Sequence, residues 1–213
     1  QAQGTRVTQN IFYKNTPPDG TEFTEHLSVA EDIFVEVSHG PTLMDNNIFL
    51  SEVAGRFCTQ GIALVHNLIA GSFVYVGNGS DNGSKVFPSP RYTPYHVPHR
   101  TEINGFMTIL HGDARFYNNV FVQQPVRQLL VDYAKDRKID RLDLMNYIVG
   151  TKPYDGYPGA EEYFAGFQEN NYKIREERDK YYDHLPVYSG GNVYFNGCLL
   201  YTSDAADDLT RVD

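Results

Sequence analysis

A short phrase built around asparagine recurs along the first two thirds of the chain and limits what the chain can fold into. The copies read VTQNIF at 7–12, MDNNIF at 44–49, VHNLI at 65–69 and FYNNVF at 116–121. Aligning them superposes Asn10, Asn47, Asn67 and Asn119, and a weaker fifth copy is GNVY at 191–194. Short apolar units repeated between turn residues are typical of stacked supersecondary structure.

The segments between the asparagines predict strands. Residues 33–37, 63–65 and 73–76 are short apolar or alternating runs, and no helical pattern separates them. The pattern predicts an all-β, right-handed parallel β-helix, in which equivalent residues of successive coils stack one strand spacing apart. An asparagine amide both donates and accepts, so a stacked column explains the repeat. The alternative is an antiparallel sandwich in which the phrases match by coincidence.

The periodicity changes after Pro125. Apolar residues recur at helical spacing over 126–133 and 142–149, and PGAEEYF at 158–164 has the composition of a helix start. We therefore expect β-helix coils over 1–124, a mostly helical or irregular insertion over 125–185, and a returning β-helix strand over 186–197.

The final stretch, CLLYTSDAADDLTRVD at 198–213, resembles translated sequencing-adapter DNA. We expect residues 198–213 to be a non-native tail and the chain, which begins with Gln1, to be a fragment; the alternative is a genuine acidic tail.

Composition excludes several classes. A net charge of −9 without a basic cluster argues against nucleic-acid binding. No uninterrupted apolar run approaches the length of a membrane-spanning helix, and two cysteines cannot form a disulfide scaffold. The sequence leaves the oligomeric state and the compartment open, with a cytoplasmic or periplasmic bacterial protein favoured.

Glu36 is the main candidate for a catalytic residue. Period-two alternation over 33–37 turns Ile33, Val35 and Val37 inward and Glu36 outward. A shift of 20 residues, the spacing from Asn47 to Asn67, predicts that Glu36 stacks on Arg56. A shift back by 37 falls two residues before Gln1, where a carboxylate would complete a retaining glycosidase pair.

Other polar residues are weaker candidates for substrate binding. Arg56 is suited to bind a hydroxyl or a carboxylate of the substrate. His39 and His66 are candidates for substrate binding as well, although a role in a turn or in the core also suits these two histidines. His111 occupies the repeat position equivalent to His39. Two further pairs are Asp113 with Arg115, which we expect to pair locally, and His96 with His99, which lack the further ligands of a zinc site. We expect no metal and no cofactor.

Several long phrases resemble glycoside hydrolase family 120. They are DIFVEVSHGP at 32–41, LMDNNIFL at 43–50, LVHNL at 64–68, YTPYHVPH at 92–99 and GDARFYNN at 112–119. The resemblance implies a β-xylosidase on a right-handed parallel β-helix, acting on xylo-oligosaccharides or related small glycosides. It implies that Glu36 is the general acid/base and that the nucleophilic aspartate precedes Gln1. The sequence departs from the family pattern in a long loop at 17–30 and in Ser38, where we expect asparagine.

Two other functions stay open. One is a polysaccharide lyase or epimerase on the same fold, which would need calcium-binding carboxylates or a basic residue in the cleft. The other is a non-catalytic β-helix that binds carbohydrate, because a fold alone does not fix a function.

Overall fold

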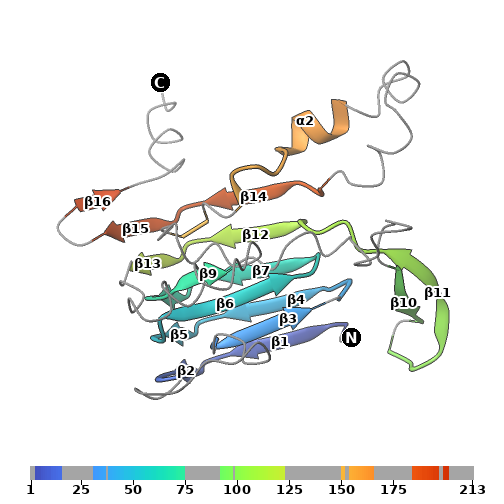
Figure 1. Ribbon diagram of the computed structural model, residues 1–213, viewed down its shortest axis with the longest axis horizontal. Helices are drawn as coiled ribbons and strands as arrows, with labels where there is room; N and C mark the ends of the chain where they lie inside the picture. The colour runs from blue at the N-terminus through green and yellow to red at the C-terminus, as the bar shows by residue number, and fades with distance from the viewer. Residues whose placement is uncertain are drawn as a thin grey trace, which may run out of the picture.

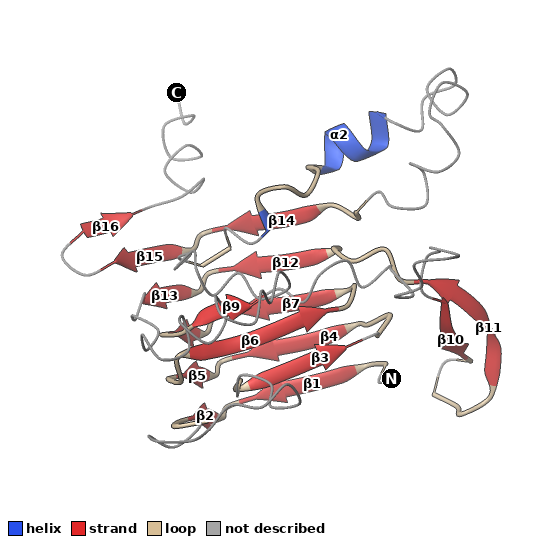
Figure 2. Ribbon diagram, in the orientation of Figure 1, coloured by secondary structure: helices blue, strands red, loops and turns tan. Residues whose placement is uncertain are grey.

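The computed structural model describes residues 3–15, 31–36, 38–74, 92–97, 99–122, 150–151, 154–165, 184–196 and 199–201. In this part of the chain the strands form three sheets and one separate hairpin (Figures 1 and 2). No helix in the described residues is long and apolar enough to cross a membrane.

The three sheets run side by side along the stack. The five-stranded sheet holds β1 (Thr5–Thr8), β4 (Thr42–Asp45), β7 (Ile62–Val65), β12 (Ala114–Tyr117) and β14 (Val187–Gly190). The six-stranded sheet holds β2 (Ile11–Phe12), β5 (Ile48–Phe49), β8 (Leu68–Ile69), β13 (Val120–Val122), β15 (Val193–Asn196) and β16 (Leu199–Tyr201). The three-stranded sheet holds β3 (Ile33–Glu36), β6 (Val53–Cys58) and β9 (Ser72–Val74).

Each coil contributes one strand to each sheet in a fixed order, and equivalent strands of neighbouring coils pair in parallel. Strands β3, β4 and β5 make one coil, and β6, β7 and β8 make the next. The pairs β1–β4, β4–β7, β7–β12 and β12–β14 are all parallel. The predicted all-β, right-handed parallel β-helix is therefore confirmed, and the antiparallel sandwich is wrong. In the described residues only the β10–β11 hairpin and the β15–β16 pair are antiparallel.

The asparagine column is present and extends through the fifth copy. The side-chain oxygen of Asn67 accepts hydrogen bonds from the backbone N and Nδ2 of Asn47, at 2.9 and 3.1 Å. The same two bonds join Asn10 to Asn47, Asn67 to Asn119, and Asn119 to Asn192. Each Nδ2 from Asn47 upward also donates to a backbone carbonyl of the preceding coil. The column thus satisfies amide groups at the corner between two sheets, where strand pairing cannot reach them.

A left-handed residue precedes each asparagine and makes this corner. The φ angles at Gln9, Asn46, His66, Asn118 and Gly191 lie between 55° and 64°. A single left-handed residue turns the chain sharply without a loop. The repeated phrase therefore encodes one tight bend per coil.

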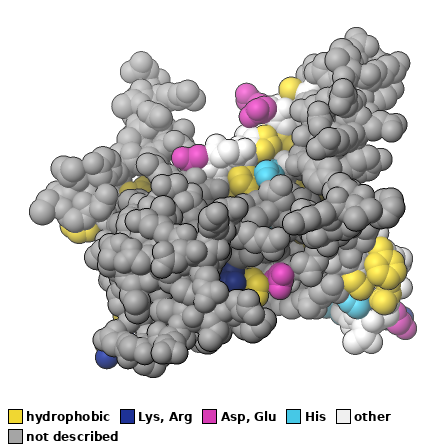
Figure 3. Space-filling view, in the orientation of Figure 1, with side chains coloured by type: hydrophobic (Ala, Val, Ile, Leu, Met, Phe, Trp, Pro, Cys, Tyr) yellow, Lys and Arg dark blue, Asp and Glu magenta, His cyan; other side chains and the backbone are white. Residues whose placement is uncertain are grey.

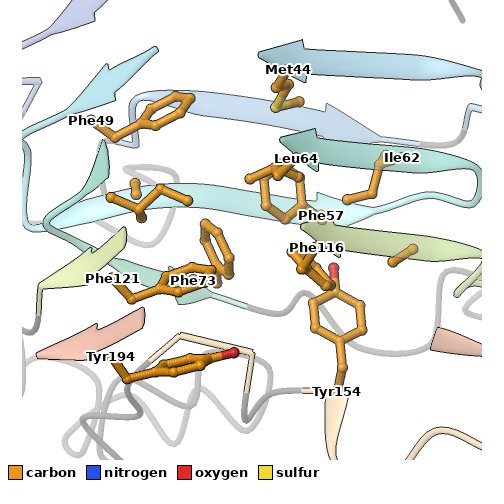
Figure 4. Close-up of a cluster of buried hydrophobic side chains, with 13 residues drawn as sticks. Met44, Phe49, Phe57, Ile62, Leu64, Phe73, Phe116, Phe121, Tyr154 and Tyr194 are labelled. Carbon is orange, nitrogen blue, oxygen red and sulfur yellow. The ribbon is translucent and has the colours of Figure 1, made fainter. Parts of the chain in front are cut away.

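Aromatic and aliphatic side chains fill the interior in columns (Figure 4). Phe12 stacks on Phe49 at 4.9 Å between ring centroids, and Phe121 stacks on Tyr194 at 5.0 Å. Strand pairing places Ile69 between Phe49 and Phe121. The same inner positions recur in every coil because the strands pair in register.

The chain between the coils forms excursions. The hairpin of β10 (Tyr92–His96) and β11 (Ile103–Thr108) lies to one side of the stack (Figure 1). Within the predicted insertion, α2 (Ala160–Ala165) begins two residues after Pro158, as expected for a helix start. The helices predicted over 126–133 and 142–149 lie outside the described residues.

Candidate functional site

Glu36 ends strand β3 and points away from the interior. Ile33 and Val35 pack against the core, whereas Phe34 and Glu36 are exposed. The predicted outward orientation of Glu36 is confirmed, and Val37 lies outside the described residues. The catalytic role of Glu36 stays a prediction.

Among the strands that the structure describes, β3 lies at the edge of its sheet, which affects what can approach Glu36. The order of the three-stranded sheet is β3–β6–β9, so one long edge of β3 pairs with β6. Along the chain, β3 directly precedes β4 of the five-stranded sheet, and β6 directly precedes β7.

The predicted stacking of Arg56 on Glu36 is wrong: the pairing is displaced by two residues along the strand. The Cα partner of Glu36 is Cys58, and Arg56 is the partner of Phe34. The five-stranded sheet does keep a shift of 20, since Thr42 pairs with Ile62. The difference arises in the turns, because the link from β3 to β4 has two residues more than the link from β6 to β7.

Arg56 is instead held by a carboxylate on the outer side of this sheet. Its Nη2 lies 2.7 Å from Oε2 of Glu31, and both side chains are about one-tenth exposed. The guanidinium carbon lies 4.7 Å from the centre of the Phe34 ring. The sequence predicts that Arg56 binds a hydroxyl or a carboxylate. In the structure it binds a carboxylate, which belongs to Glu31 of the same chain. Sequence reasoning did not identify Glu31, because Glu31 lies outside the repeated phrase.

In Figure 3, acidic, basic and hydrophobic side chains lie together near the middle of the molecule. The outer face of the three-stranded sheet thus carries both charge and an aromatic surface, since Phe34 is 45% exposed. Such a surface can contact a ligand through both hydrogen bonds and apolar packing.

His39 joins the turn after β3 to the hairpin. Its Nε2 contacts the hydroxyl of Thr93, its Nδ1 lies 3.4 Å from Nε2 of Gln60, and its ring meets Tyr95 edge-on at 6.2 Å. Burial lowers the pKa of the His39 imidazole, and the bond to the Thr93 carbonyl opposes this shift. His39 therefore fixes the hairpin to the residues that follow Glu36.

The other two histidines of the repeat have structural positions. His66 is the exposed left-handed residue of a corner, and its Nε2 lies 3.3 Å from Nδ2 of Asn118. His111 is fully buried and bonds to the carbonyl oxygen of Phe57 at 2.6 Å and to the hydroxyl of Tyr157. Burial lowers the pKa of His111 to about 4.

The remaining candidates line two pockets, and Pro41 lines both of them. Asp113 and Arg115 form the expected pair, with an Oδ1–Nη1 distance of 2.7 Å. His96 and His99 line a pocket of about 700 Å³ between the hairpin and the turn. No group of three His, Cys, Asp or Glu side chains in the described ranges is placed to hold a metal ion.

The fold and these positions define a parallel β-helix protein with a carboxylate on its outer face and a hairpin at the neighbouring turn. A solved structure described as XylC in complex with xylose has the same fold, with a TM-score of 0.59 and 33% sequence identity. The alignment covers 90% of this chain and 23% of XylC, so the chain spans about a quarter of the length of XylC. XylC is a member of glycoside hydrolase family 120, and the likeness confirms the resemblance that the sequence phrases predict. No family model matches the chain, and no curated protein matches it.

Proposed function

We propose that this chain is part of a retaining glycosidase that hydrolyses β-xylosides, with Glu36 as the general acid/base. One observation carries the proposal: Glu36 is exposed at the end of β3, on the edge strand of its sheet. The similarity to a protein solved with xylose supports a xylose-containing substrate.

No strand of the described residues pairs with the other edge of β3, which supports a second carboxylate beside Glu36. A strand that precedes β1 and pairs with β3 would lie about 4.8 Å away. Retaining glycosidases hold their two carboxyl groups about 5–5.5 Å apart. A carboxylate next to Glu36 on such a strand would have the separation that retention requires.

In the first half of the reaction, the carboxylic acid of Glu36 donates its proton to the glycosidic oxygen. The partner carboxylate attacks the anomeric carbon, the bond to the leaving oxygen breaks, and a glycosyl ester forms. In the second half, the Glu36 carboxylate takes a proton from water, and that water attacks the same carbon. The ester breaks and xylose leaves with its configuration retained.

The test compares this chain with a chain extended upstream by one coil, using an aryl β-xyloside as substrate. We expect no turnover by residues 1–213 and measurable turnover by the extended chain. In the extended chain, Glu36→Ala should lower turnover of xylobiose about 10²- to 10⁴-fold. Azide should then restore turnover of the aryl substrate and yield a β-xylosyl azide.

Glu161→Ala is the matched control, because Glu161 is an exposed carboxylate in helix α2, outside the three-stranded sheet and the hairpin. It should leave turnover unchanged. Turnover by residues 1–213 alone, or an extended Glu36→Ala chain as active as the parent, would refute the assignment.

A further inference from the structure

The pocket beside the hairpin has walls from two parts of the chain that are distant in sequence. Gly4, Gly40 and Pro41 come from the coils, and Tyr95, His96, His99 and Arg100 line it from the hairpin. Its volume of about 700 Å³ is within the range of small-molecule sites. In Figure 3 the hairpin presents histidine and hydrophobic side chains on its surface.

The hairpin does not stand alone beside this pocket. Thr93 is buried and contacts His39, and the ring of Tyr95 packs against the same imidazole. His39 immediately precedes the Gly40–Pro41 wall. One histidine thus sets the distance between the two walls of the pocket.

The chemistry of the walls fits a neutral ligand with many hydroxyl groups. A carbonyl can only accept, so the bond from His96 Nδ1 to the Thr101 oxygen at 3.1 Å places the proton on Nδ1. In the neutral ring, Nε2 is then an acceptor for a hydroxyl group. Arg100 makes one contact of 3.2 Å with Glu102, and a guanidinium has five N–H donors.

Apolar surface and the absence of carboxylates narrow the ligand class further. Pro41, Tyr95 and Val97 supply apolar surface next to these polar groups. The lining residues, all within the described ranges, include no Asp or Glu, which disfavours a metal ion or another cation. A sugar ring, which has both C–H faces and hydroxyl edges, matches this mixture.

We infer that this pocket binds the sugar on the leaving-group side of the bond that Glu36 protonates; the inference rests on the proposed function. Gly40 follows Glu36 by four residues, which span at most about 14 Å. Strand β3 also points toward the side of the molecule on which the hairpin lies (Figure 1). An oligosaccharide whose glycosidic oxygen lies at Glu36 can therefore extend into the pocket.

The test titrates residues 1–213 with xylobiose, and separately with xylose, while the imidazole Cε1–H resonances are followed by NMR. Xylobiose should shift the signals of His96 and His99 more than xylose does at equal concentration. His99→Asn should weaken xylobiose binding roughly two- to tenfold, the loss of one hydrogen bond. Asparagine suits this position because the φ of His99 is 59°.

Lys14→Asn is the matched control, since Lys14 is also exposed, has a φ of 56° and does not line the pocket. It should bind xylobiose like the parent. Xylobiose binding that leaves both histidine signals unmoved and is unaffected by His99→Asn would overturn the inference, as would no binding at all. Neither outcome decides the proposed function, which the azide experiment on the aryl xyloside tests without a second sugar.

Discussion

The substitution Asn67→Ala tests whether the asparagine column stabilises the fold. Asn67 is 2% exposed and lies in the middle of the column. Alanine removes two bonds accepted from Asn47, at 2.9 and 3.1 Å, and two bonds donated by Nδ2, to Met44 and Asn119, both at 2.9 Å. The backbone N of residue 67 keeps its bond to Asn119.

The expected loss is about 4 kcal/mol. Four hydrogen bonds at a net value of about 1 kcal/mol each give this figure. The backbone N–H of Asn47 adds to the loss, because a buried donor without an acceptor costs about 1–3 kcal/mol. Whole domains are stable by only about 5–15 kcal/mol, so the variant should be close to unfolding.

The control is Asn10→Ala at the end of the column. Asn10 is exposed and donates to Asn47 and Thr8, so its loss should cost less than about 1 kcal/mol. Free energies of unfolding from urea titrations, followed by far-UV circular dichroism, measure both variants. If the two variants differ by less than about 0.5 kcal/mol, the column is not a major source of stability.

Three further predictions concern stability. Arg56→Leu should lower the free energy of unfolding by about 3 kcal/mol, because it leaves the buried carboxylate of Glu31 without its cation. The double variant Arg56→Leu/Glu31→Leu should recover most of this loss, and urea titrations measure both. Burial lowers the pKa of His111 from 6.5 to about 4. Between these pH values the unfolded chain binds more protons than the folded chain. The free energy of unfolding should therefore fall by roughly 3 kcal/mol as the pH drops from 6.5 to 4. His111→Asn should flatten that part of the stability–pH curve, and an unchanged slope would exclude His111 as its source. Gly61→Ala should cost about 1–2 kcal/mol because φ is +74°, whereas Gly105→Ala, with no atom within 4 Å of the added carbon, should be near neutral by thermal melting.

The repeat predicted the fold because each phrase encodes its own corner. A left-handed residue followed by asparagine occurs at 9–10, 46–47, 66–67, 118–119 and 191–192. These dipeptides determine where the chain bends and which amide joins the column, so their positions alone align the coils. The inner face followed from the same alignment, since period two fixes Val35 inward and Glu36 outward.

The surroundings of Glu36 are harder to predict from the sequence, because they depend on the lengths of the turns and on pairing between residues that are distant in the sequence. A single shift of 20 describes the five-stranded sheet but not the three-stranded sheet, so a uniform repeat predicts the wrong neighbour for Arg56. Nothing in the asparagine phrases indicates that Thr93 and Tyr95 meet His39, 54 and 56 residues earlier in the chain. The phrase YTPYHVPH, which the family resemblance includes, was the one signal available for this hairpin.

The longer turn after β3 connects these two observations. It brings Phe34, rather than Glu36, level with Arg56, and the Glu31–Arg56 pair then forms two residues away from Glu36 along the strand. The same turn contains His39, Gly40 and Pro41, which contact the hairpin or line its pocket. If the two extra residues were part of β3 instead of the turn, the shift would be 20 in this sheet as well, and Arg56 would lie beside Glu36, where a cation would favour the carboxylate form. A general acid must carry its proton, so the extra length of this turn suits the role proposed for Glu36 better than the uniform repeat would.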